Sequence, residues 1–365
     1  MNRRTVVRRA GLGAVAATAL AAPAVAQGLP EIKWRLTSSF PKSLDTIYGA
    51  GEHFARRVAQ LTDNKFQIRV FAGGEIVPAL QALDAVQNGT VECCHTAPYY
   101  YVGKDPTFAF DTAVPFGLNT RQHNAWVYHG GGQELMREFY KDYNITSYTL
   151  SHTGAQMGGW FRKEIKAPDD LKGLKMRIGG FAGQVLAKLG VIAQQIAGGD
   201  IYPALEKGII DAAEWVGPYD DQKLGFNKVA PFYYYPGWWE GGAALSLFVN
   251  LKAIETLPEA YRHAIEIAAG ETVAWSVAKY DAQNPRALRE LVANGTRLAP
   301  FPAPVLEACF NAAQELYAET CAANPRFKKV HDHYMAFRRE QVLWFRVAEG
   351  SFDTFMARQS ANNRI

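Results

Sequence analysis

Arg177 and Glu214 carry opposite charges, follow apolar segments and have the chemistry to bind a charged ligand. Arg177 lies at the end of a strand predicted over 175–178, and two glycines follow it. A guanidinium group is planar and permanently charged, so it can bind both oxygens of a carboxylate. An arginine at such a position can equally form a structural or surface ion pair, and position alone leaves both interpretations open.

Glu214 and Trp215 directly follow a short apolar strand predicted over 209–213. In open α/β sheets, ligands bind beyond the carboxyl ends of strands, which is where this pair lies. A carboxylate there can be an ion-pair partner, a ligand of a hard cation or a catalytic base. Glu240 ends an aromatic stretch over 232–239, which is typical either of a pocket wall or of core packing.

The common motifs of catalysis do not occur in the sequence. It contains no H-E-x-x-H, no G-x-S-x-G and no Walker A motif, and its G-x-G-x-x-A-like string begins at Gly11. His331 and His333 are too few for a zinc site. Nothing in the sequence therefore compels a catalytic function.

Strands and helices alternate along the part of the chain that carries these residues. From residue 32 to 94 the pattern is strand, helix, strand, helix, strand, which favours a parallel α/β sheet. The same alternation restarts after His152. At 365 residues the chain can form two hydrophobic cores, and we predict an α/β protein with two lobes. Lobe I comprises 27–152 and 241–256, and lobe II comprises 153–240.

Helical periodicity dominates the last third of the chain. We predict a long helix over 257–285 that bridges both lobes. The segment 286–365 is expected to add helices that pack on the lobes or on a second subunit, because apolar residues gather on one face of each helical pattern.

The N-terminal segment accounts for the whole formal charge of +4. Four arginines precede an apolar run that ends in Ala-Val-Ala, a pattern typical of a cleaved signal peptide, here 1–26. Its first arginine pair resembles a twin-arginine export signal. The run is shorter than the roughly 20 apolar residues that span a bilayer. We therefore expect export to the periplasm, and the neutral remainder gives no electrostatic reason to expect a nucleic-acid partner.

The four cysteines show no spacing typical of a metal or redox site. Cys93 and Cys94 are adjacent, and Cys309 and Cys321 lie far from them in the sequence. Burial as small apolar side chains is favoured over a disulfide.

Three segments resemble the extracytoplasmic solute receptors of TRAP (tripartite ATP-independent periplasmic) transporters. They are SSFPKS over 38–43, QQIAGGDIYPALEKG over 194–208 and EWVGPYDD over 214–221. The similarity is greatest to the receptors for 2-oxo acids such as pyruvate, and it extends over essentially the whole chain. It implies a fold of the periplasmic binding protein type, in which two lobes joined by a hinge close around the ligand.

The resemblance also implies the binding residues. Arg177 binds the ligand carboxylate, and a cation is held by the side chains of Gln156 and Glu214 and by the carbonyl of Trp215. Oxygen ligands suit a hard cation, with sodium as the first choice and calcium as the alternative. Gln156 and Trp215 also contact the substrate, and the other substrate-binding residues implied are Tyr100, Tyr101 and Glu240.

The implied partners are a small monocarboxylate, the membrane permease subunits of a TRAP transporter and a second copy of the chain. Two alternatives stay open. The same fold can bind a 2-hydroxy acid such as lactate, whose hydroxyl would replace the keto oxygen on the cation. A periplasmic 2-oxo acid lyase or decarboxylase would instead use Glu214 or Glu240 as a base and the cation as a Lewis acid.

Overall fold

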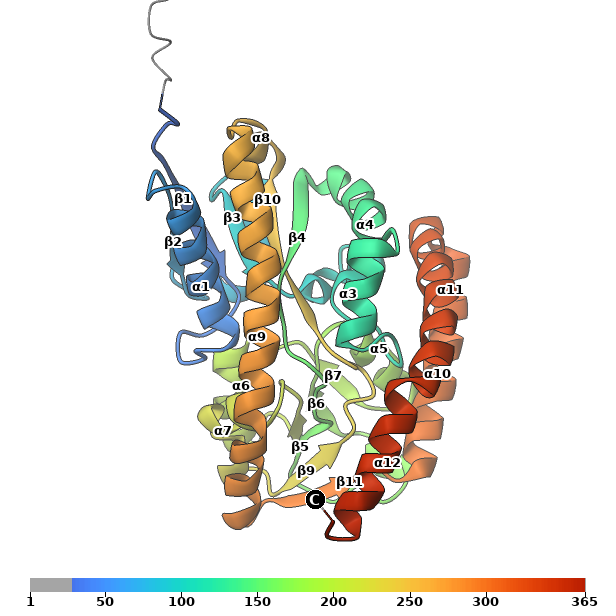
Figure 1. Ribbon diagram of the computed structural model, residues 1–365. Helices are drawn as coiled ribbons and strands as arrows, with labels where there is room; N and C mark the ends of the chain where they lie inside the picture. Colours follow the sequence, from blue (N-terminus) through green and yellow to red (C-terminus); the bar gives the residue numbers. More distant parts are fainter. Residues whose placement is uncertain (1–27, 365) are drawn as a thin grey trace, which may run out of the picture. The chain divides into compact units, whose positions relative to one another are not determined.

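A computed structural model describes residues 28–364 of the chain (Figure 1). The predicted signal peptide, 1–26, lies outside the described residues. Among the described residues, no helix has the length and apolar character that crossing a membrane requires. The described cysteines are free thiols.

The first sheet has five strands in the order β2-β1-β3-β10-β4. The parallel pairs, β1 with β2 and β1 with β3, agree with the strand–helix alternation of the sequence. The inserted strand β10 is antiparallel to both of its neighbours, because the chain re-enters this sheet on its return from the second one. The bounds are β1 (Ile32–Ser38), β2 (Phe66–Phe71), β3 (Cys93–Thr96), β4 (Ile145–His152) and β10 (Ala244–Asn250).

Helices of the first lobe cover this sheet and supply part of its core. Phe54 and Val58, one turn apart on α1, are fully buried against strand residues such as Trp34 and Leu36. The bounds are α1 (Ile47–Leu61), α2 (Ala82–Gln87), α3 (Thr120–His129), α4 (Gly132–Tyr140) and α8 (Leu251–Glu255).

The second sheet has six strands in the order β11-β9-β5-β8-β6-β7. Strand β6 is parallel to β7 and β8, and β5 is antiparallel to β8 and β9. The bounds are β5 (Gly159–Phe161), β6 (Lys175–Arg177), β7 (Ile192–Gln194), β8 (Ala212–Ala213), β9 (Phe232–Tyr235) and β11 (Arg297–Pro300). Its helices are α5 (Gly180–Lys188), α6 (Gly198–Glu206) and α7 (Pro218–Leu224).

The strand expected over 209–213 is shorter in the structure, which keeps only Ala212 and Ala213 as β8. The amides of Ile209 and Ile210 both donate to the carbonyl of Ala204, so these residues complete the end of α6. Apolar character predicted the segment correctly, but hydrogen bonds to the preceding helix decide where the strand begins.

The long helix α9 (Glu259–Ala293) contacts α1 and β4 of the first lobe and α7 of the second (Figure 1). It therefore connects both lobes, but it is longer than the helix predicted over 257–285. Pro285 lies inside it, and the final turns continue because Leu291 is buried in the main core cluster.

The C-terminal segment contains one element that the helical pattern did not predict. Strand β11 pairs in parallel with β9 and extends the second sheet. The helices that follow are α10 (Ala303–Ala323), α11 (Pro325–Val347) and α12 (Glu349–Ala361). Helix α10 contacts α5, and α11 contacts α3 and α4, so this segment touches both lobes.

Two adjacent buried acids on α7 accept hydrogen bonds from buried side chains, and one of them joins the two lobes. Asp220 accepts hydrogen bonds from Thr46 of the first lobe at 2.5 Å and from Tyr280 of α9 at 2.7 Å. Asp221 accepts from Trp160 Nε1 at 2.9 Å and from the Tyr233 hydroxyl at 2.7 Å. Asp220 therefore ties three parts of the fold together.

Asp221 predicts a measurable pH dependence of stability. Burial raises its pKa to about 7, so the folded protein keeps a proton that the unfolded carboxyl, with a pKa of about 3.9, releases. This contribution is complete below about pH 4 and is lost as the pH rises through about 7. From about pH 5 to pH 8, the stability of an Asp221→Asn variant relative to wild type should therefore rise by about 3 kcal/mol.

Urea unfolding of both proteins at the two pH values measures this difference. Buried histidines such as His123, whose pKa burial lowers to about 4, titrate in both proteins and cancel. A stability difference that stays constant with pH would show that Asp221 is ionised throughout.

Candidate functional site

Arg177 lies fully buried at the carboxyl end of β6. Its Nε donates to the carbonyl of Ile196 at 3.1 Å, and its Nη1 donates to the carbonyl of Glu214 at 2.7 Å and to the Glu214 carboxylate. Its Nη2 is buried and has no hydrogen-bond partner among the described residues. One edge of the guanidinium is therefore fixed by the protein, while the other can still donate.

Glu214 is the buried counter-ion of Arg177. Its Oε1 accepts from Arg177 and from the Gly179 amide, the latter at 2.8 Å. Its Oε2 is buried without a partner. Burial raises the pKa of Glu214, while the charge of Arg177 and the hydrogen bond from Gly179 act to lower it. The carboxylate thus matches the guanidinium in having one bonded and one unbonded side.

Gln156 and Trp215 present further unpaired polar atoms. Gln156 donates from Nε2 to the hydroxyl of Thr153 at 3.2 Å, and its Oε1 is buried without a partner. The Trp215 ring covers the Arg177 guanidinium, with 5.1 Å between the guanidinium carbon and the ring centroid. Its Nε1 is likewise buried and unpaired.

Arg177 lies directly behind the Trp215 ring, and Gln156 and Trp215 line a small space between the lobes, which we name the inner cavity. Its volume is about 10 Å³, about what a single water molecule requires. The lobes are therefore closed in this structure. The inner cavity is lined by Phe40, Ile47, Tyr99, Tyr100, Thr153, Gln156, Trp215, Val216, Ala243 and Leu245.

Tyr100 lies at the inner cavity as expected, but the structure does not bring Tyr101 there. The Tyr101 hydroxyl accepts from the amide of Leu83 at 3.1 Å and bonds the hydroxyl of Thr96 at 2.9 Å. Its ring packs on Phe108 in the core of the first lobe. Tyr101 is therefore a structural residue.

Tyr99 occupies the place at the inner cavity that the sequence analysis gave to Tyr101. Residues 98–101 form a 3-10 helix, in which successive side chains point about a third of a turn apart. A run of three tyrosines does not reveal which of them faces the cleft. Tyr99 packs against Gly179 and Gly180 of the second lobe, where an added Cβ would come within 2.5 and 2.7 Å of its ring. The two glycines after Arg177 thus allow the lobes to close.

Glu240 is buried close to this cluster, and its Oε2 has no hydrogen-bond partner among residues 28–364. Burial and the nearby charge of Glu214 raise the pKa of Glu240 well above its usual value. Its side chain also interacts with Tyr99 across the cleft. Glu240 therefore adds a buried polar group next to Glu214 and Tyr99.

The oxygens expected to hold a cation fit that role chemically. Glu214 Oε2 and Gln156 Oε1 are buried acceptors without donors, and leaving such a group unpaired costs about 1–3 kcal/mol. Carboxylate and amide oxygens suit hard cations such as sodium or calcium. No group of three or more His, Cys, Asp or Glu side chains within 28–364 has the arrangement of a metal site. A cation here must therefore use amide and carbonyl oxygens as well.

The arrangement can bind a small anion and a cation side by side. Arg177 Nη2 is a donor without an acceptor, and the two unpaired oxygens are acceptors without a donor. A ligand carboxylate can accept the hydrogen bond from the guanidinium directly. A cation bound to the carboxylate and to a neighbouring ligand oxygen can in turn be held by the two unpaired protein oxygens.

Comparisons with known proteins show what this chain is similar to. The family model for bacterial extracellular solute-binding proteins of family 7, DctP, matches residues 37–324. A monocarboxylate 2-oxoacid-binding periplasmic protein of Nostoc sp. is 49% identical over 361 residues, covering 97% of this chain and 99% of that protein.

Two solved structures resemble the fold over most of its length. A TRAP transporter solute binding protein from Bordetella bronchiseptica is 54% identical and has a TM-score of 0.90, and the match covers 92% of this chain and 99% of that protein. Its crystal structure is a mixed-occupancy dimer, with calcium and picolinate bound in one active site and an apo second site. A TRAP periplasmic solute binding protein from Pseudoalteromonas atlantica, with bound sodium and pyruvate, is 37% identical and has a TM-score of 0.86. The match covers 88% of this chain and 98% of that protein.

Proposed function

This chain belongs to the DctP family and is a solute receptor of a TRAP transporter, and we propose that its ligand is a 2-oxo acid such as pyruvate, bound with a cation. Members of the family bind solutes and are not enzymes, so the lyase and decarboxylase alternative falls away. Receptors of this family are periplasmic. For this chain we propose export through a cleaved signal peptide over 1–26.

The observation that carries the ligand proposal is the set of unpaired buried atoms around Arg177 and Glu214. Arg177 and Glu214 neutralise one another, so a carboxylate bound alone would bring an uncompensated negative charge into a closed site. Such a charge costs several kcal/mol. A cation bound together with the anion removes this cost, which explains why the receptor needs both.

Each residue of the site then has a stated role. Arg177 donates from Nη2 to the ligand carboxylate, and the cation is held by Glu214 Oε2, Gln156 Oε1 and the carbonyl of Trp215. The cation supplies positive charge and binds ligand oxygens directly. Trp215 covers the guanidinium, and the remaining walls come from Tyr99, Tyr100 and Glu240.

Ligand entry requires the lobes to separate, because the inner cavity holds only about 10 Å³. We propose that the crossing strands β4 and β10 and the helix α9 act as the hinge. Closure then forms contacts such as the hydrogen bond between Thr46 and Asp220, and bound ligand stabilises the closed state.

A second copy of the chain is the proposed partner of the C-terminal helices. Helices α11 and α12 expose an unusual number of large apolar side chains, and the relative from Bordetella bronchiseptica is a dimer. Light scattering coupled to size exclusion should give twice the monomer mass. The exposed side chains are Val342, Leu343, Trp344, Val347, Phe352 and Phe355.

Tryptophan fluorescence of the mature protein tests the ligand proposal, because Trp215 lines the inner cavity. Pyruvate should give a saturable change in fluorescence that requires sodium or calcium. The protein should not consume the added pyruvate, because it binds without catalysing a reaction. Titration in choline buffer supplies the control without sodium or calcium. A response to lactate together with none to any 2-oxo acid would refute the proposed ligand and support a hydroxy acid.

A further inference from the structure

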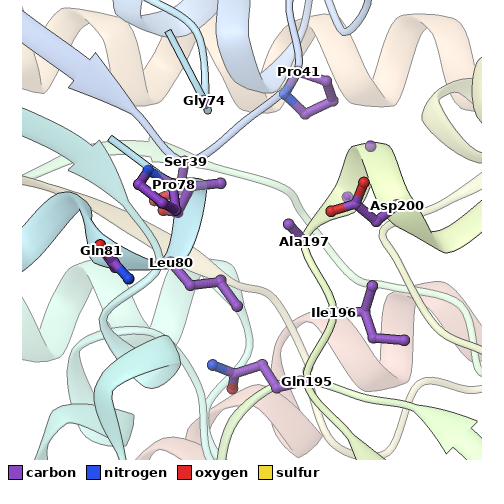
Figure 2. Close-up of a pocket in the computed structure, with 14 residues that line it drawn as sticks. Ser39, Pro41, Gly74, Pro78, Leu80, Gln81, Gln195, Ile196, Ala197 and Asp200 are labelled. Atoms are coloured by element: carbon purple, nitrogen blue, oxygen red, sulfur yellow. The ribbon is translucent and has the colours of Figure 1, made fainter. Parts of the chain in front are cut away.

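A second cavity, which we name the outer cavity, lies between the lobes (Figure 2). Its volume is about 630 Å³, within the usual range for sites that bind small molecules. One wall consists of residues from 39–41 and 73–81 of the first lobe, and the other is residues 195–200 of the second. None of the binding residues assigned above lines it.

The inner and outer cavities share one wall. The carbonyl of Ile196, a residue that lines the outer cavity, accepts the hydrogen bond from Arg177 Nε at 3.1 Å. Gly198 lines the outer cavity and lies against Trp215, because an added Cβ would come within 2.4 Å of the Trp215 ring. The residues that bind the ligand head group are therefore one layer of atoms away from the outer cavity.

Gln195 connects the two lobes at the edge of the outer cavity. Its Nε2 donates to the carbonyl of Tyr100 in the other lobe at 2.8 Å, and its Oε1 accepts from the Gly180 amide at 3.4 Å. Tyr100 lines the inner cavity and Gln195 lines the outer one. In Figure 2, Gln195 lies at the lower edge of the outer cavity, facing the side of Leu80 and Gln81.

The lining of the outer cavity suits an uncharged chain. Most of it is apolar side chains and glycine, and its one charged side chain, Asp200, is an acid. No lysine or arginine is present to pair with a second carboxylate. The inner cavity, by contrast, holds only about 10 Å³ and has no room for additional carbon atoms.

We propose that the outer cavity receives the carbon chain of longer monocarboxylate 2-oxo acids, and that Gln195 determines the chain length that the site accepts. This inference rests on the proposed function. With pyruvate the Gln195 side chain stays bonded to Tyr100, whereas a longer chain must displace it. Dicarboxylates are disfavoured, because their second charge would lie near Asp200 without a counter-ion.

The first test is a Gln195→Ala variant titrated calorimetrically with pyruvate and 2-oxohexanoate at saturating sodium or calcium. Removing the side chain should raise the affinity for 2-oxohexanoate relative to pyruvate roughly 10-fold, since each buried methylene is worth about fourfold. Gln81→Ala is the matched control, because Gln81 is an exposed glutamine on the opposite wall of the same cavity. It should leave the ratio of affinities unchanged.

A second variant tests the outer cavity without altering Gln195. Gly199 lines the cavity, and a Cβ added there meets no atom within 4 Å, so Gly199→Phe can fill the space. It should lower the affinity for 2-oxohexanoate relative to pyruvate roughly 10-fold. Gly103→Phe, at an exposed glycine of the first lobe with equally open surroundings, is the control.

The outcomes separate this inference from the function on which it rests. If the wild type binds pyruvate and neither Gln195→Ala nor Gly199→Phe changes the ratio, the outer cavity is not part of the site and the inference is wrong. If the wild type binds no 2-oxo acid, the proposed function fails and the inference fails with it. Opposite shifts of the ratio in the two variants support the inference.

Discussion

Replacing Arg177 by lysine is expected to weaken pyruvate binding roughly 100-fold, because a buried charged hydrogen-bond partner typically contributes 2–5 kcal/mol. Arg177 makes two kinds of contact at once. Nε and Nη1 donate to Ile196 and Glu214, while Nη2 is buried without a partner and is the proposed donor to the ligand. A lysine ammonium is a single point charge and cannot reach all three partners. It would keep the ion pair with Glu214 and lose the donor to the ligand.

Lysine is the informative substitution, because it keeps the positive charge. An apolar residue would leave Glu214 buried without a counter-ion, at a cost of about 3–5 kcal/mol, and a loss of binding could then reflect unfolding. Arg162→Lys provides the control, since Arg162 also lies in the second lobe and donates to a backbone carbonyl, that of Val229. Pyruvate affinity that is equal in both variants and in wild type would remove Arg177 from the site.

Glu214→Gln is expected to abolish the cation dependence of binding. The Gly179 amide and Arg177 both donate to Oε1, so the glutamine oxygen must take that position. The amide nitrogen then replaces Oε2 and turns two hydrogens toward the place of the cation. We expect affinity at saturating sodium or calcium to fall roughly 10-fold or more, because both the charge and a ligand atom are lost.

Binding that remains in this variant should be the same with and without the cation. Arg177 keeps its charge and can pair with the ligand alone. Fluorescence titration in sodium, calcium and choline buffers measures this, with the exposed Glu206→Gln as a control in the same lobe. A Glu214→Gln protein that still requires the cation would show that other residues hold it.

The polar groups of the site could be predicted largely from the sequence. Arg177, Glu214 and Trp215 follow short apolar segments, and Gln156 was implied by the resemblance to the receptors of one transporter family. The structure brings these four residues together. The alternation of strands and helices also predicted two α/β lobes and a long helix in contact with both.

Tyr99 and Tyr101 show where local pattern was insufficient. The three consecutive tyrosines have identical side chains and are all buried. Only the direction in which the 3-10 helix points each side chain decides which of them faces the cleft. The antiparallel insertion of β10 and the addition of β11 to the second sheet were equally hidden, because strand pairing joins residues far apart in the chain.

The sequence by itself determined the residue types, the order of the elements and the chemistry available for binding, because these depend on local pattern and motif. Only the tertiary structure showed that Arg177 and Glu214 each keep one unpaired side, and that Gln195, which lines the outer cavity, donates a hydrogen bond to Tyr100 of the other lobe. Both features arise from contacts between lobes. Burial and hydrogen-bond satisfaction are properties of a packed arrangement, and no local stretch of residues specifies them.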